Sequence, residues 1–161
     1  MIPHILDITG QQIGGILQDA AAHHAIPLLL LLTCGIAESG LDPMAYRGGV
    51  WPDVSVGAFQ QTVLYAASYG VGNGENTPAN IEVCKARFCD WAFSADVASQ
   101  QLASGYEIAG DLGFTGDNRL LAALSKYNAG SVQAFGNWWW TGANCAAYRS
   151  ALEKAKVMLG D

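Results

Sequence analysis

The segment Ile36-Ala37-Glu38-Ser39-Gly40 holds a carboxyl group where acid catalysis is favoured. A strongly apolar run precedes it, so we expect Glu38 in the last turn of a buried helix. A helix C-terminus is the negative end of the helix dipole, and apolar neighbours disfavour the ionised form, so both raise a carboxyl pKa. A glycosidase acid must hold a proton at neutral pH and deliver it to the leaving oxygen. The plain alternative is a surface glutamate at a helix end, or a glutamate whose carboxyl is satisfied by a neighbouring hydroxyl.

Two further segments carry side chains suited to binding sugars. In Ser55-Val56-Gly57-Ala58-Phe59-Gln60-Gln61, the glycine permits close approach of a ligand to the backbone, and the amide of Gln60 can donate to and accept from N-acetyl and hydroxyl groups. In Lys126-Tyr127-Asn128-Ala129-Gly130, the tyrosine offers an apolar plate with a polar tip and the asparagine offers donors and an acceptor. Each segment also has a plain structural interpretation, as a turn before a helix and as a capped helix end.

Taken together, in this order and spacing, the three segments resemble the lytic transglycosylase and goose-type lysozyme superfamily. The matching stretches read IAESG at 36–40, SVGAFQQ at 55–61 and KYNAG at 126–130, and the resemblance covers about residues 26–158. It implies a mainly α, compact lysozyme-like domain over residues 1–161, with a groove for the glycan strand of bacterial peptidoglycan. The activity it implies is cleavage of the β-1,4 bond between N-acetylmuramic acid and N-acetylglucosamine.

The resemblance also assigns roles by position. Glu38 corresponds to the general acid that later acts as a base, and Ser39 to the hydroxyl that orients it. The substrate-binding set that it implies comprises Ser39, Ser55, Gly57, Phe59, Gln60, Tyr127, Asn128 and Tyr148, with Phe59 as a groove wall in place of the family's usual methionine. The chain departs from the goose-type enzymes at Thr62, where they have an aspartate.

The number of carboxyl groups at the site distinguishes two reactions. Ordinary glycoside hydrolysis uses two, about 5–5.5 Å or 6.5–9.5 Å apart. The resemblance to lytic transglycosylases implies a reaction with one, in which the acid protonates the glycosidic oxygen and then takes the proton from the muramic 6-hydroxyl, closing a 1,6-anhydro ring. Thr62 favours this route. The alternative is a hydrolytic muramidase with a water held by Asp53 or Asp42, although Asp42 before Pro43 also suits a simple turn.

The elements that position these residues are predicted to be helical. Thr9 and Gln12 have the spacing of a capping box, and no alternating run supports a strand. We predict a loop over 40–56 and helices over 9–24, 27–39, 58–69, 77–109, 117–127 and 143–159, with Asp117 as a cap and Gly160 as the final stop.

Composition limits the classes of partner. Hydrophobic residues make up 51% and charged residues 14% of the 161 residues, which predicts a folded core, and the net charge of −6 argues against nucleic acid. The apolar run 26–37 is shorter than the roughly 20 residues of a membrane span, and the first 46 residues hold no Lys or Arg to begin a signal peptide. We therefore expect a monomer without membrane insertion, and a phage lysin released by a holin or carried on the virion. An inactive glycan-binding or virion structural module is the alternative from another class.

The cysteines and tryptophans leave several possibilities open. Cys34, Cys84, Cys89 and Cys145 lack zinc-site spacing, and His4, His23 and His24 lie far from them in sequence, so we expect no metal and no cofactor. Cys34 reads as a small buried hydrophobe, and Cys84 could pair with Cys89 in an oxidising setting. Trp138, Trp139 and Trp140 form either core packing or a stacking platform for glycan.

Overall fold

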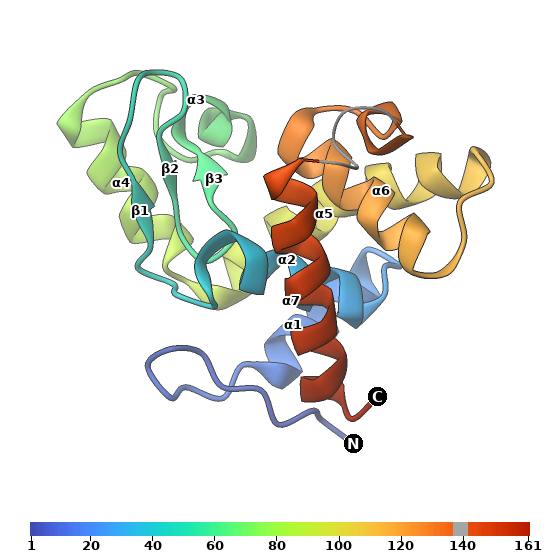
Figure 1. Ribbon diagram of the computed structural model, residues 1–161. Helices are drawn as coiled ribbons and strands as arrows, with labels where there is room; N and C mark the ends of the chain where they lie inside the picture. Colours follow the sequence, from blue (N-terminus) through green and yellow to red (C-terminus); the bar gives the residue numbers. More distant parts are fainter. Residues whose placement is uncertain (137–141) are drawn as a thin grey trace.

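A computed structural model describes residues 1–136 and 142–161, and helices account for most of them (Figure 1). The prediction of a mainly α chain is confirmed. The run Trp138, Trp139 and Trp140 lies outside the described residues. The helices are α1 Gly14–His23, α2 Leu28–Ser39, α3 Val63–Ala66, α4 Pro78–Phe88, α5 Trp91–Asp111, α6 Gly116–Ala129 and α7 Ala143–Leu159, with short 3-10 helices η1 Ala67–Tyr69 and η2 Gln133–Gly136.

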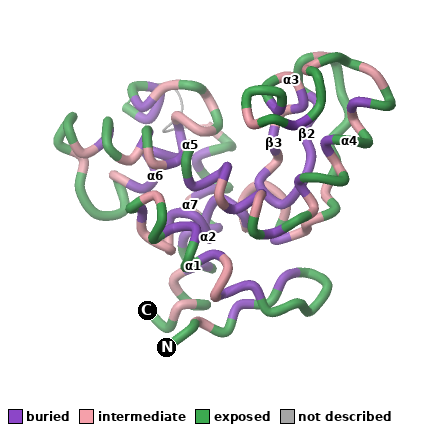
Figure 2. Tube along the Cα trace, turned by 180° about the vertical axis from the view of Figure 1, so that it is seen from behind, coloured by how far each residue is buried: buried purple, intermediate pink, exposed green. Residues whose placement is uncertain are grey.

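Helix α2 lies at the centre of the fold, in contact with α1, α5, α6 and α7. Its residues 30–35 are all buried, and Figure 2 shows buried trace where α2, α5 and α6 meet as well as in β2 and β3. The helix begins after Pro27, which has an extended backbone. It ends at Gly40, whose φ of 69° suits glycine and whose N–H bonds to the carbonyl of Ile36 at 3.0 Å. The apolar run thus brings Glu38 to the point where the helix leaves the core.

Three two-residue strands form a small antiparallel sheet in the order β1-β2-β3. They are β1 Tyr46–Arg47, β2 Ser55–Val56 and β3 Gln61–Thr62. The sequence-based prediction of a loop through 40–56 and of no strand was therefore wrong. Two residues are too few for the apolar-polar alternation by which a strand is recognised in a sequence.

Two hydrophobic clusters divide the molecule into a main lobe and a smaller β lobe. The main cluster gathers residues of α1, α2, α5, α6 and α7. The β-lobe cluster consists of Val54, Val56, Val63, Ala66, Val71, Cys84, Phe88 and Val97. Helix α5 contributes to both, because Val97 faces the β-lobe cluster while Leu102 faces the main one. In Figure 1 the sheet and α4 stand on one side of α2 and α5, and α6 stands on the other.

Several predicted helix boundaries were wrong. The capping box does not form: Thr9 Oγ1 bonds to Asp7, and α1 begins only at Gly14. The helix predicted over 58–69 shortens to α3 and η1, because Gln61 and Thr62 join the sheet. The helix predicted over 77–109 breaks between α4 and α5, where Asp90 caps the new helix by accepting from the Phe93 N–H at 2.8 Å. The last helix, Ala143–Leu159 with Gly160 as its stop, was predicted correctly.

No single helix within the described residues is both long and apolar enough to cross a membrane. Helices α1 and α2 meet the length and composition of a span only as a pair, and they are bent 120° from each other.

Candidate active site

Glu38 opens onto a cavity of about 530 Å³ at the end of α2. We call this the Glu38 cavity. The residues that line it come from α2, the loop and sheet of the β lobe, and the end of α6: Glu38, Arg47, Gly48, Gly49, Val50, Asp53, Ser55, Gln60, Thr62, Tyr127 and Asn128. The fold therefore brings together the three sequence segments that were expected to share a site.

The environment of Glu38 favours a protonated carboxyl. Burial raises the pKa of Glu38 from 4.5 to about 7, against an opposing effect of the Arg47 guanidinium. Burial also raises the pKa of the Cys34 thiol and of the Tyr127 hydroxyl well above their ordinary values, so both stay neutral. Among these three neighbouring groups, Glu38 is the one that gains and loses a proton near neutral pH.

One row of the sheet faces the Glu38 cavity. Arg47 pairs with Ser55 and Ser55 pairs with Thr62, so the three side chains stand in line across the strands on one face. All three line the cavity. Sequence reasoning missed Arg47, because its place depends on the register of a strand that the sequence did not reveal. Thr62 lines the same cavity as Glu38, and in place of a second carboxyl it presents a hydroxyl group there.

Hydrogen bonds fix Gln60 in its position beside the cavity. Its Oε1 accepts from the Ser55 hydroxyl at 2.8 Å, and its Nε2 donates to the carbonyl of Gly57 at 3.0 Å. Its φ of 50° lies in the left-handed region, which is uncommon for a residue with a side chain. Ser39 holds the same segment against the end of α2, since its hydroxyl donates to the Ala58 carbonyl at 2.7 Å. Ser39 thus supports the cavity wall without lining it.

Tyr148 and Tyr127 approach the acid from α7 and α6. Tyr148, which is only 3% exposed, donates a hydrogen bond from its hydroxyl to Glu38 Oε1. The Tyr127 hydroxyl donates to the Phe59 carbonyl at 2.6 Å and accepts from Gln61 Nε2 at 3.0 Å. Asn128 Oδ1 accepts from Asn144 Nδ2 at 3.0 Å, which joins the ends of α6 and α7 beside the cavity.

A second cavity of about 540 Å³ adjoins the first, since both share Gln60, Thr62, Tyr127 and Asn128. We call it the amide cavity. Gln61 and Gln101 exchange two amide hydrogen bonds, of 3.1 and 3.0 Å, across its floor and so connect β3 to α5. Its lining adds polar and aromatic side chains to the shared four: Gln61, Tyr65, Tyr69, Gln100, Gln101, Ser104 and Lys126. Gln61 and Lys126 belong to segments that were expected to bind sugar. The other five side chains were not anticipated from the sequence.

Three predicted site residues lie elsewhere. Phe59 is fully buried and packs edge-on against Trp91 with ring centres 6.0 Å apart, so the prediction that it forms a groove wall was wrong. Gly57 has a φ of 80° and lies so close to Phe88 that an added Cβ would meet the Phe88 carbonyl oxygen at 2.8 Å. Gly57 therefore allows close packing in the β lobe, and it does not line the Glu38 cavity. Asp42 accepts from the Met44 N–H at 2.9 Å as a turn residue, away from the cavity that Asp53 does line.

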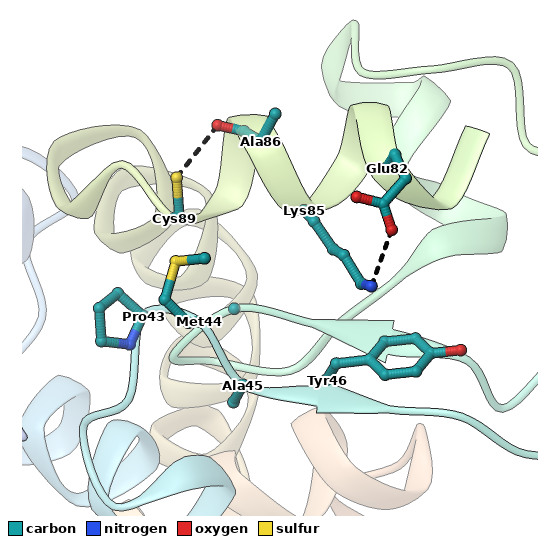
Figure 3. A pocket seen from close by; sticks show the side chains of 9 residues that line it. Pro43, Met44, Ala45, Tyr46, Glu82, Lys85, Ala86 and Cys89 are labelled. Carbon is teal, nitrogen blue, oxygen red and sulfur yellow. Dashed lines mark hydrogen bonds and ion pairs between the residues drawn. The ribbon is translucent and has the colours of Figure 1, made fainter. Parts of the chain in front are cut away.

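A further cavity of about 400 Å³ in the β lobe, between β1 and α4, lies apart from the acid (Figure 3). Its walls are the largely apolar segment 43–46 and the face of α4 that carries Lys85, whose ammonium donates to Glu82 at 2.8 Å. The Cys89 thiol at its edge donates to the Ala86 carbonyl. Cys84 points into the β-lobe cluster, and all four cysteines are free, so the possible Cys84–Cys89 bridge is not formed.

No family model, curated protein or solved structure matches this chain. The chemistry of the site therefore rests on its own geometry. A carboxyl that titrates near neutral pH faces a cavity lined by amide, hydroxyl and guanidinium groups. Such a group can give a proton to an oxygen atom of a polar, uncharged ligand and take one back.

Proposed function

We propose that the chain is a peptidoglycan-cleaving glycosidase with Glu38 as its acid and base, and that it acts as a lytic transglycosylase. The observation that carries the proposal is the position of Glu38. Its pKa is raised to about 7, and from the end of α2 it shares one cavity with Gln60, from the turn between β2 and β3, and with Tyr127 and Asn128, from the end of α6. In this proposal the Glu38 cavity and the amide cavity together form the groove of a lysozyme-like fold.

Each step of the reaction has a group to perform it. Protonated Glu38 gives its proton to the glycosidic oxygen while the bond from that oxygen to the muramic C1 breaks. The carboxylate then accepts the proton of the muramic 6-hydroxyl as this oxygen bonds to C1, which returns Glu38 to its starting state. Gln60 and Asn128 supply amide groups for the N-acetyl and hydroxyl groups of the sugars. Tyr148 holds the acid in place through its bond to Oε1.

A hydrolytic muramidase is the second candidate, because Asp53 lines the same cavity as Glu38. In that reaction Asp53 would hold the water that attacks C1 in place of the 6-hydroxyl. Asp42 has no part in this candidate, since its carboxyl is engaged in a local turn. An inactive glycan-binding or virion structural module is the alternative from another class. It has no need of a carboxyl whose pKa lies near 7.

Mass spectrometry of the fragments released from purified peptidoglycan separates these functions. The proposal predicts fragments with 1,6-anhydromuramic ends, and it predicts that Asp53→Asn leaves these ends and their rate of release largely intact. Reducing ends that disappear in Asp53→Asn would establish the muramidase instead. If the protein sediments with peptidoglycan but releases no fragments at any pH from 5 to 8, the binding module is correct.

A further inference from the structure

The end of α1 carries a cluster of metal-binding side chains far from the Glu38 cavity. We define the His24 cluster as His23, His24 and Asp96, whose ligating atoms all lie within 4.8 Å of one another. The two histidines end α1, and Asp96 comes from the second turn of α5, 72 residues after His24 in the chain. Only the fold brings the carboxylate to the imidazoles, so the sequence, in which we expected no metal site, does not reveal this cluster.

We propose that the His24 cluster is a zinc site that links the end of α1 to α5. Two imidazoles and a carboxylate are a common ligand set for zinc, with water completing the tetrahedron. Ligand atoms held at 2.0–2.1 Å around one zinc ion lie about 3.3 Å apart. The widest separations in the cluster, up to 4.8 Å, must therefore shorten, and the 2.7 Å between His24 and Asp96 must widen; both are changes that side-chain rotations at a helix end can supply.

The contacts within the cluster already favour this arrangement. His24 Nε2 lies 2.7 Å from Asp96 Oδ1, and the rings of His23 and His24 meet edge to face with centres 4.8 Å apart. The His24 side chain is 18% exposed and that of Asp96 is 51% exposed, so an ion from solution can reach both. Zinc would take the place of the hydrogen that His24 and Asp96 share, which requires release of any proton on that nitrogen.

The surroundings of the cluster suit a cation. A cavity of about 410 Å³ beside it is lined by Ile16, Asp19, Ala20, His23, Ala92 and Asp96, and includes no Lys or Arg. Asp19 lies one turn before His23 on α1 and lines the same cavity, so its carboxylate adds negative charge beside the cluster. A simple ion pair between His24 and Asp96 would account for one contact, but it gives no role to His23 or Asp19.

Zinc titration of the full chain tests the proposal. The protein is stripped with EDTA and titrated with zinc chloride in a calorimeter at pH 7.5, with circular dichroism confirming the fold of each variant. We expect one zinc ion per chain. Loss of a second-shell group weakens zinc binding about 10–100-fold, so His24→Gln and Asp96→Asn, which remove ligands, should weaken it at least tenfold. His4→Gln is the matched control, because His4 bonds to Gln12 away from the cluster. Cys89→Ser tests whether the least buried thiol contributes to zinc binding.

NMR of the unaltered protein gives an answer that needs no variant. Zinc should shift the imidazole resonances of His23 and His24 and leave those of His4 in place. The proposal is overturned if the wild type shows no binding, if His24→Gln and Asp96→Asn bind as tightly as the wild type, or if His4 shifts as much as His24.

Discussion

Replacing Glu38 with glutamine should stabilise the protein increasingly as the pH rises. Burial raises the pKa of Glu38 in the folded state from 4.5 to about 7. Between these two values the folded chain binds more protons than the unfolded chain, so stability falls as the pH rises through this interval. This shift in the pKa of Glu38 lowers the free energy of unfolding by about 3 kcal/mol once the pH exceeds 7. Glutamine keeps the shape and the Oε1 acceptor of the glutamate but has no charge to bury.

Urea unfolding of the wild type and Glu38→Gln at intervals from pH 4 to pH 8 measures this effect. The free energy of unfolding of the variant relative to the wild type should grow by about 3 kcal/mol across that range, most of it between pH 4.5 and 7. Glu107→Gln is the matched control, because Glu107 is exposed on α5 and its replacement should give a flat difference. A flat profile for Glu38→Gln as well would refute the view that the fold disfavours the ionised carboxyl.

Three further predictions concern Arg47 and Thr62, which line the Glu38 cavity, and Asp7, which does not. Arg47→Gln removes a charge that lowers the pKa of Glu38, so the pH at which peptidoglycan release declines should move upward; an unchanged or lower value would count against this pairing. Thr62→Asp adds a second carboxyl to the Glu38 cavity, so mass spectrometry should detect a larger share of reducing ends than with Thr62→Asn, and equal shares would contradict the role given to this position. Asp7, only 5% exposed, accepts from Trp91 Nε1 at 2.9 Å and from Thr9 and Gln11. Burial alone would raise its pKa, but these donors lower it, so its contribution should fade at low pH. At neutral pH, Asp7→Ala should lower the free energy of unfolding measured in urea by about 2–3 kcal/mol. A decrease no larger than that caused by replacing the exposed Asp111 with alanine would show that this network contributes little.

The part of the site that follows from local sequence could be predicted. The apolar run before Glu38 predicted a buried helix ending beside the acid, because burial of such a run and the glycine after it act over a few residues. The final helix was also predicted correctly, because Gly160 marks its end and adopts the left-handed conformation there. The segments containing Gln60 and Tyr127 were expected at one site only through the family resemblance that their order and spacing suggested, and the fold does bring them together.

What could not be predicted depends on contacts between distant residues. Arg47 reaches the cavity through its pairing with Ser55, and two-residue strands leave no pattern in the sequence. Phe59 was predicted to form a groove wall, but its ring is buried in the core, where it packs against Trp91, 32 positions later in the chain. The break between α4 and α5 did have a local signal, the capping carboxylate of Asp90, which the continuous helical spacing of apolar residues concealed.

The most direct test of the account is the rate at which the wild type and Glu38→Gln release soluble fragments from purified peptidoglycan at pH 6. General acid catalysis contributes about 100- to 10,000-fold to such reactions. Release by Glu38→Gln should therefore fall at least about 100-fold while the folded variant still sediments with the polymer. Release by Glu38→Gln at the wild-type rate would show that another group supplies the proton and would contradict the assignment of Glu38.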